Sequence, residues 1–194
     1  LLHQAHWDAA TGLLGPPRLI ANLAPASGRY CRGVAVADFT GDGWADAAVG
    51  RNAGATTTIH LFVNDGCGAL VPRGEVASMA GQSNYAMDYA AGDFDGDGNA
   101  DLLAQGNTGR VAVLLGDGRG GFAPQAELSL TANGRGLDTG DFDRDGRLDF
   151  VRGRYSAGVV ELFLGQGNGT FAAARSVGQF GNDPYGVAAG DFDG

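Results

Sequence analysis

Hydrophobic residues occur in short runs along the chain, and glycine-rich segments separate these runs. The clearest runs cover residues 58–63, 111–115 and 159–164, and each is rich in Val, Leu or Phe. Short apolar runs bounded by glycine turns are typical of β-strands, and they leave no room for helices of ordinary length. The pattern therefore predicts an all-β fold.

The order of these segments repeats. An alternating run enters an acidic loop, an apolar run leaves it, and two further predicted strands follow, joined by a glycine turn. The acidic loops begin at Asp38, Asp93, Asp141 and Asp191, which are 55, 48 and 50 residues apart. Four strands in roughly 50 residues match one blade of a β-propeller. A β-sandwich is the alternative all-β fold, but it does not require the same loop at a fixed period.

The repeat predicts a β-propeller of four-stranded antiparallel blades, with three complete repeats and partial blades at both ends. Because the fourth loop stops after Asp193, we expect residues 1–194 to be one segment of a larger propeller in a longer protein. The predicted divisions are the end of a preceding blade at 1–32, blades at 33–80, 86–130 and 136–178, and the start of a further blade at 185–194.

The charge of the chain is concentrated in these loops. The net charge is −9, from 22 acidic and 13 basic residues, and 13 of the acids lie in the four acidic loops. The acidic balance argues against nucleic acid as a partner. No stretch is long and apolar enough for a membrane helix, so we expect no membrane insertion. All the basic residues are Arg, which favours a bacterial source.

Four carboxylates within nine residues repel one another unless a cation neutralises them. Ca²⁺ takes six to eight oxygen ligands and suits a flexible loop with a central glycine. An EF-hand requires Glu at position twelve and flanking helices, and Mg²⁺ prefers fewer protein ligands, so both are disfavoured. An Asp-Gly turn without a metal is the remaining alternative, but three complete copies argue against it. We therefore predict three complete Ca²⁺ sites and one truncated site.

The predicted ligands follow the loop positions. They are Asp38, Thr40, Asp42, the backbone carbonyl of Trp44, and Asp46; Asp93, Asp95, Asp97, the carbonyl of Asn99, and Asp101; Asp141, Asp143, Asp145, the carbonyl of Arg147, and Asp149; and, in the truncated loop, Asp191 and Asp193. Thr40 supplies a hydroxyl in place of a carboxylate, so we expect the weakest affinity in the first loop.

These motifs resemble a known family. Asp-Phe-Asp-Gly-Asp-Gly-x-x-Asp, together with Gly-x-Gly-x-Phe at residues 167–171, is similar to FG-GAP (VCBS-type) repeats, the blades of integrin α-subunit propellers and of many secreted bacterial proteins. The resemblance covers nearly the whole chain. It implies that calcium ions stiffen loops on one face while a ligand binds the opposite face, in an extracellular or cell-surface setting. Thr40 and Cys67 depart from the family pattern.

We expect the opposite face to carry residues that suit protein or sugar recognition. They are Tyr30, Asn84, Tyr85, Tyr89, Asn133, Arg154, Tyr155, Asn182 and Tyr185. The alternative for each tyrosine is packing between blades. No nucleophile elbow, P-loop or Cys-x-x-Cys motif is present, so we do not expect an enzyme.

The expected function is a calcium-stabilised, non-catalytic module for extracellular binding or adhesion. The alternatives are a carbohydrate-binding lectin, a propeller domain of a secreted enzyme, and a structural subunit of a surface assembly. Cys31 and Cys67 are predicted at opposite ends of one blade, roughly 17 Å apart, so we expect no disulfide between them.

Overall fold

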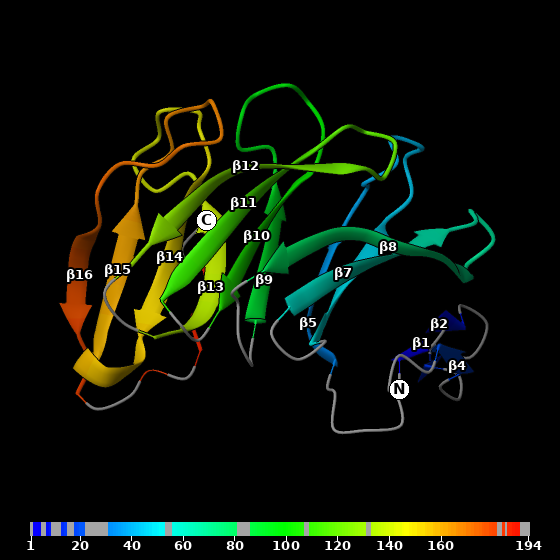
Figure 1. Ribbon diagram of the computed structural model, residues 1–194, viewed down its shortest axis with the longest axis horizontal. Coiled ribbons are helices and arrows are strands. Elements are labelled where there is room, and N and C mark those ends of the chain that lie inside the picture. Colours follow the sequence, from blue (N-terminus) through cyan, green and yellow to red (C-terminus); the bar gives the residue numbers. More distant parts are fainter. Residues whose placement is uncertain are drawn as a thin grey trace.

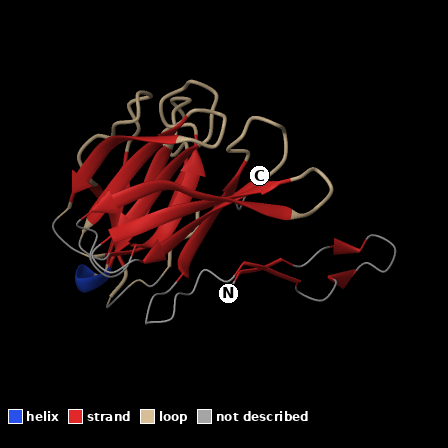
Figure 2. Ribbon diagram, turned by 45° about the vertical axis from the view of Figure 1, so that its right-hand side comes forward, coloured by secondary structure: helices blue, strands red, loops and turns tan. Residues whose placement is uncertain are grey.

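The computed structural model describes residues 2–4, 7–8, 13–14, 18–21, 31–52, 56–80, 86–106, 109–130, 133–181, 184 and 186–190. In this part of the chain the secondary structure is β, apart from one turn of 3₁₀-helix, η1 (Tyr155–Ala157) (Figure 2). The all-β prediction is confirmed. Among the described residues, no helix is long or apolar enough to cross a membrane.

Three four-stranded antiparallel sheets follow one another along the chain, and in each the strand order is the chain order. Sheet I contains β5 (Cys31–Ala37), β6 (Asp46–Asn52), β7 (Thr56–Asn64) and β8 (Leu70–Ala80). Sheet II contains β9 (Ala86–Gly92), β10 (Asp101–Gly106), β11 (Arg110–Gly116) and β12 (Phe122–Ser129). Sheet III contains β13 (Gly134–Gly140), β14 (Asp149–Arg154), β15 (Val159–Phe163) and β16 (Arg175–Gln179).

Near the N-terminus, two short strand pairs precede the sheets. β1 (Leu2–Gln4) pairs with β4 (Arg18–Ala21), and β2 (Trp7–Asp8) pairs with β3 (Leu13–Leu14). Both pairs are antiparallel.

The sheets lie side by side in chain order (Figure 1), and their inner strands meet, because β9 packs between β5 and β13. Sheets I and II enclose one apolar core, which includes Ile59, Leu61, Leu102 and Leu114. Sheets II and III enclose a second core. Because successive side chains of a strand point to opposite faces, the middle strands of sheet II serve both cores. We call the two interfaces junction I–II and junction II–III.

Each junction is joined at one end by a hydrogen bond between a glycine turn and an acidic loop. The acidic loops connect the first strand of each sheet to the second, and we call them loop I (38–46), loop II (93–101) and loop III (141–149). Gly120, in the turn between β11 and β12, donates its N–H to the carbonyl of Phe39 in loop I at 2.8 Å. Gly169 of sheet III donates to the carbonyl of Phe94 in loop II at 2.9 Å. The turn of one sheet therefore contacts the acidic loop of the preceding sheet.

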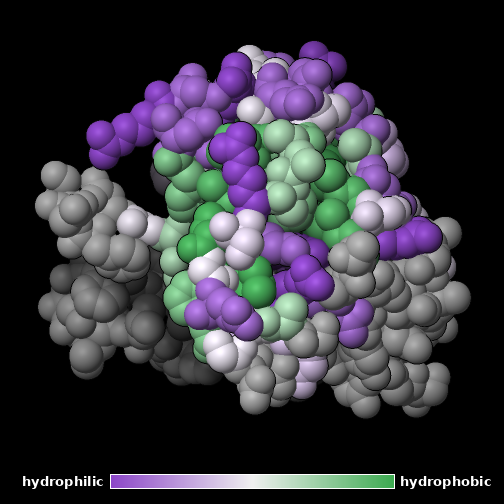
Figure 3. Space-filling view, turned by 90° about the vertical axis from the view of Figure 1, so that its left-hand side faces the viewer, coloured by the Kyte–Doolittle hydropathy of each residue, from purple (hydrophilic) through white to green (hydrophobic). Residues whose placement is uncertain are grey.

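An aromatic pair reinforces each of these contacts. Phe39 meets Phe122 edge to face with ring centroids 5.4 Å apart, and Phe94 meets Phe171 in the same manner at 5.8 Å. Phe39 and Phe94 are consequently 1% and 2% exposed, whereas Phe142, at the same position of loop III, is 41% exposed. Figure 3 views the molecule from the side of sheet III and shows apolar side chains gathered in the middle of that face. Among the described residues, no further sheet covers this face and the three sheets do not close into a ring.

Candidate metal centre

A glycine turn shapes every acidic loop. Gly43, Gly98 and Gly146 occupy the sixth position with φ angles of 86°, 87° and 84°, in the left-handed region that glycine adopts without steric cost. The chain then reverses into the second strand. In loop II this places Asp101 opposite Gly92, the residue before the loop. The first and last residues of the loop are thereby brought to one place.

The ninth aspartate of each loop is fully buried and acts as a bridge. In sheet II, Asp101 accepts the N–H of Phe94, within the loop, at 2.7 Å and the N–H of Gly116, at the end of β11, at 2.8 Å. The same bonds recur for Asp46 with Phe39 (3.1 Å) and Asn64 (2.8 Å), and for Asp149 with Phe142 (2.9 Å) and Gly165 (2.8 Å). The sequence did not predict this bridge; its only signal is the Gly or Asn that starts each later turn.

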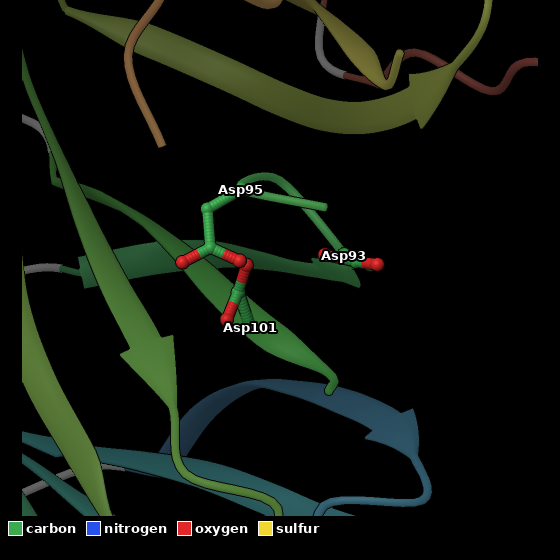
Figure 4. A group of neighbouring side chains, drawn as sticks. All are labelled: Asp93, Asp95 and Asp101. Atoms are coloured by element: carbon green, nitrogen blue, oxygen red, sulfur yellow. The ribbon is translucent and has the colours of Figure 1, made fainter. Parts of the chain in front are cut away.

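Three carboxylates converge in loop II. Asp93, Asp95 and Asp101 each offer one oxygen, and these atoms all lie within 4.8 Å of one another. Figure 4 shows Asp95 pointing toward Asp101, with Asp93 beside them. An equivalent group in loop III consists of Asp141, Asp143 and Asp149. The structure thus brings together six of the predicted ligands, in two groups.

The electrostatics of the loop II group favour a cation. Burial raises the pKa of Asp101 to about 6, although the N–H groups of Gly116 and Phe94 act in the opposite direction. The charges of Asp95 and Asp97 raise it further. A bound divalent cation would favour the ionised carboxylate instead. All the converging atoms are hard oxygens, the type of ligand that Ca²⁺ takes, so the residues of loops II and III fit such an ion.

The fifth loop position lies outside these groups. The side chain of Asn99 donates to Asp97 at 2.8 Å, and Arg147 forms an ion pair with Asp145. In loops II and III the seventh residue therefore contacts the fifth through its side chain. The roles predicted for the backbone carbonyls of Asn99 and Arg147 remain predictions.

Loop I is arranged differently. Its carboxylates, from Asp38, Asp42 and Asp46, do not form such a group within the described part of the chain. The hydroxyl of Thr40 donates to Asp46 Oδ2 at 3.1 Å. Burial acts to raise the pKa of Asp38, but four backbone N–H groups of the loop outweigh it and lower that pKa.

Other predicted site residues occupy varied positions. The Trp44 side chain is half exposed, and its indole lies against Gly66. Asp191 and Asp193 lie outside the described residues. Cys67 is a free, exposed thiol.

The structure describes four of the residues predicted on the face opposite the acidic loops. Tyr89 is not a loop residue: it belongs to β9, is 8% exposed and packs within the core of junction I–II, so packing between sheets explains it. Tyr155 lies in η1, with the guanidinium of Arg135 4.5 Å from its ring centroid. Asn133 is exposed and Arg154 is partly buried. The remaining predicted residues lie outside the described residues: Tyr30, Asn84, Tyr85, Asn182 and Tyr185.

Comparison with known proteins gives one family. A family model described as FG-GAP-like repeat matches residues 38–104 and residues 93–152, which together make up more than half of the chain. Each match begins at the first aspartate of an acidic loop. No curated protein matches the chain.

Proposed function

Because the chain belongs to the FG-GAP-like repeat family, we propose that it is a calcium-stabilised, non-catalytic binding module built as a β-propeller. The observation that carries the proposal is the convergence of three carboxylates in loop II and again in loop III. Like charges this close repel one another strongly at low dielectric. A divalent cation supplies the positive charge that removes this repulsion.

The calcium ions have a scaffolding role in this proposal. Asp101 offers an oxygen to the loop II group and also accepts the N–H groups of Phe94 and Gly116. An ion held there would join the loop, β10 and the turn after β11 into one unit. Phe94 also receives the hydrogen bond from Gly169 of sheet III, so the same unit supports junction II–III.

The propeller is supported by the repetition of the junction. Sheets I and II meet through the same glycine bond and aromatic pair as sheets II and III. A further blade packed in this way would cover Phe142, which is 41% exposed. The chain after β16 also returns to the inner strand, because Ala189 donates its N–H to Asp138 of β13 at 2.7 Å.

We place the ligand, a protein or a glycan, on the face opposite the acidic loops. Arg135 and Tyr155 support this placement, since an Arg stacked on an aromatic ring is a common recognition surface. An extracellular setting, where calcium is plentiful, follows from the proposed ion. A glycan array read in calcium tests the glycan class. Binding that is lost in Tyr155→Ala is the expected result for a glycan ligand at this site.

The calcium proposal is tested by thermal melting with calcium and with a chelator. An ion that binds only the folded state stabilises it by roughly 2.7 kcal/mol per site at a hundredfold excess over Kd. We expect chelation to lower the Tm of the wild type, and Asp95→Asn with Asp143→Asn to remove most of that difference. Glu127→Gln removes an exposed charge on β12, outside the loops, and should leave it intact. Equal melting curves with and without chelator would refute the proposal.

A further inference from the structure

The third position distinguishes loop I from the other two acidic loops. Loops II and III carry Asp95 and Asp143 there, and both belong to the converging carboxylate groups. Loop I carries Thr40, whose hydroxyl donates to Asp46 Oδ2 at 3.1 Å. A donor thus faces the buried ninth aspartate in loop I, where loops II and III place a second acceptor.

The Asp46 carboxylate accepts hydrogen bonds from three groups. It is fully buried and accepts the N–H of Phe39 at 3.1 Å and that of Asn64 at 2.8 Å, in addition to the Thr40 hydroxyl. A buried carboxylate is stabilised by hydrogen bonds to its charged form. Asp101 and Asp149 have the two backbone bonds but no hydroxyl.

Asp38 is also satisfied by the loop itself. Its Oδ1 accepts the N–H groups of Thr40, Gly41 and Asp42 at 3.3, 2.7 and 3.2 Å, and its Oδ2 accepts that of Gly43 at 2.7 Å. The first aspartates of the other loops accept fewer such bonds: Asp93 from Gly96 and Gly98, and Asp141 from Asp145 and Gly146.

The remaining carboxylate of loop I, at the fifth position, is engaged in the same way as its counterparts Asp97 and Asp145, which accept the N–H two residues further on. Asp42 is exposed and accepts the N–H of Trp44 at 2.9 Å. Loop I thus has three carboxylates where loops II and III have four each, and each of the three is engaged by donors of the loop or its neighbouring strand.

We infer that Thr40 makes loop I a metal-independent copy of the site, in which its hydroxyl and the backbone N–H groups do the work of the cation. The three complete loops would then hold two ions rather than three. This inference rests on the proposed calcium function of loops II and III. It replaces the weak third site expected from the sequence, because the donors of loop I already satisfy the carboxylates that a cation would bind.

Loop I contains its own reporter, Trp44. Terbium is a hard, oxygen-binding trivalent ion whose luminescence is sensitised by a nearby indole. Titration of the wild type with terbium, excited through tryptophan, should give little sensitised emission, and calcium titration calorimetry should give two ions per chain. Thr40→Asp should add a third ion and a several-fold increase in emission. Trp44→Phe in the Thr40→Asp background should abolish that increase, which separates loop I from Trp7.

Melting experiments keep the inference testable if Thr40→Asp folds poorly. Thr40→Val removes the hydroxyl and should lower the Tm equally with calcium and with chelator, while Thr40→Ser should restore it. Three ions per wild-type chain, or strong Trp44-sensitised emission from the wild type, would overturn the inference. A Thr40→Val variant whose Tm is lowered in chelator but not in calcium would also overturn it.

A failure of the proposed calcium function can be told apart from a failure of the inference about Thr40. If the wild type binds no calcium, loops II and III are not calcium sites. In that case a Thr40→Val loss of Tm still supports the role of the hydroxyl in loop I, and an unchanged Tm contradicts it.

Discussion

The two junctions share the contacts at their acidic-loop ends and differ in their interiors. At junction I–II, sheet II contributes Ala104 and Ala112, which are cross-strand partners in an apolar core. At junction II–III, the equivalent cross-strand partners in sheet III are Arg152 and Glu161. Arg152 is 1% exposed and donates through Nε and Nη2 to Glu161 at 2.9 and 2.7 Å.

The difference shows which contacts the repeat needs. One backbone arrangement accepts either two methyl groups or a buried ion pair in its interior, provided that the buried charges are paired. The glycine bond and the aromatic pair at the loop end occur in both junctions. The geometry of a junction therefore depends on the contacts at its acidic-loop end. Its interior requires only that the space be filled and that buried charges be paired.

The largest expected effect comes from breaking the ion pair. Arg152→Ala leaves Glu161 buried without its main partner, which costs about 3–5 kcal/mol. Urea unfolding in saturating calcium measures the loss. Arg154→Ala is the matched control, because Arg154 reaches the same carboxylate only at 3.4 Å and is partly exposed.

The double variant sharpens the comparison. Arg152→Ala with Glu161→Ala recreates the Ala pair of sheet II and should recover much of the stability that the single variant loses. A double variant no more stable than Arg152→Ala would mean that the interior of junction II–III depends on side-chain volume rather than on charge pairing.

A smaller loss of stability is expected at a contact whose two sides are reversed between the junctions. At junction I–II the earlier sheet supplies the glycine and the later sheet the large side chain, and at junction II–III the reverse holds. Gly50 of sheet I faces Tyr89, whereas its equivalent in sheet II, Gln105, faces Gly134 of sheet III. A Cβ at Gly50 would lie 1.9 Å from Tyr89 Oη. Gly50→Ala should therefore cost about 1–3 kcal/mol through overpacking.

The two glycines respond differently to the same change. A Cβ at Gly134 would meet the flexible end of Gln105 at 2.2 Å, so Gly134→Ala should cost less than Gly50→Ala. In a double-mutant cycle by urea unfolding, Tyr89→Leu should reduce the cost of Gly50→Ala. Additive effects would show that this contact does not limit the packing of junction I–II.

Much of this arrangement could be predicted because its signals are local. The spacing of aspartates and glycines within loop II and the short apolar runs around it indicate the loop, the strands and the carboxylate group. The ion pair could not be predicted, because Arg152 and Glu161 come from different strands and each resembles an exposed charge. The donor role of Thr40 could not be predicted, because it depends on a distance between two side chains. The sequence left two positions open for Tyr89, the recognition face and the packing between blades, and only the contacts between sheets decide between them.

Tyr89 also provides a prediction of increased stability. Its hydroxyl is buried and, in the structure, has no hydrogen-bond partner, and burial raises its pKa, so it stays protonated. The equivalent residue of sheet III is Leu137, which has no polar atom to satisfy. Tyr89→Phe should therefore raise the free energy of unfolding by about 1 kcal/mol. A loss of stability instead would show that a water molecule satisfies this hydroxyl.

The smallest expected effect concerns a contact between neighbouring sheets at their outer strands. Arg73 of β8 donates to the carbonyl of Arg119, and Gln125, its equivalent in β12, donates to that of Asn168 at 3.4 Å. Both contacts are exposed, so neither contributes more than about 1 kcal/mol, and the charged donor contributes more than the neutral one.

Amide hydrogen exchange resolves this small difference, because a glycine N–H reports on each junction. Arg73→Ala should increase exchange at Gly120, which bonds Phe39, more than Gln125→Ala increases it at Gly169, which bonds Phe94. Each change should leave the glycine of the other junction unaffected if the junctions open independently. Equal increases at both glycines in either variant would mean that the two junctions open together, and that the difference between their interiors has no effect on local stability.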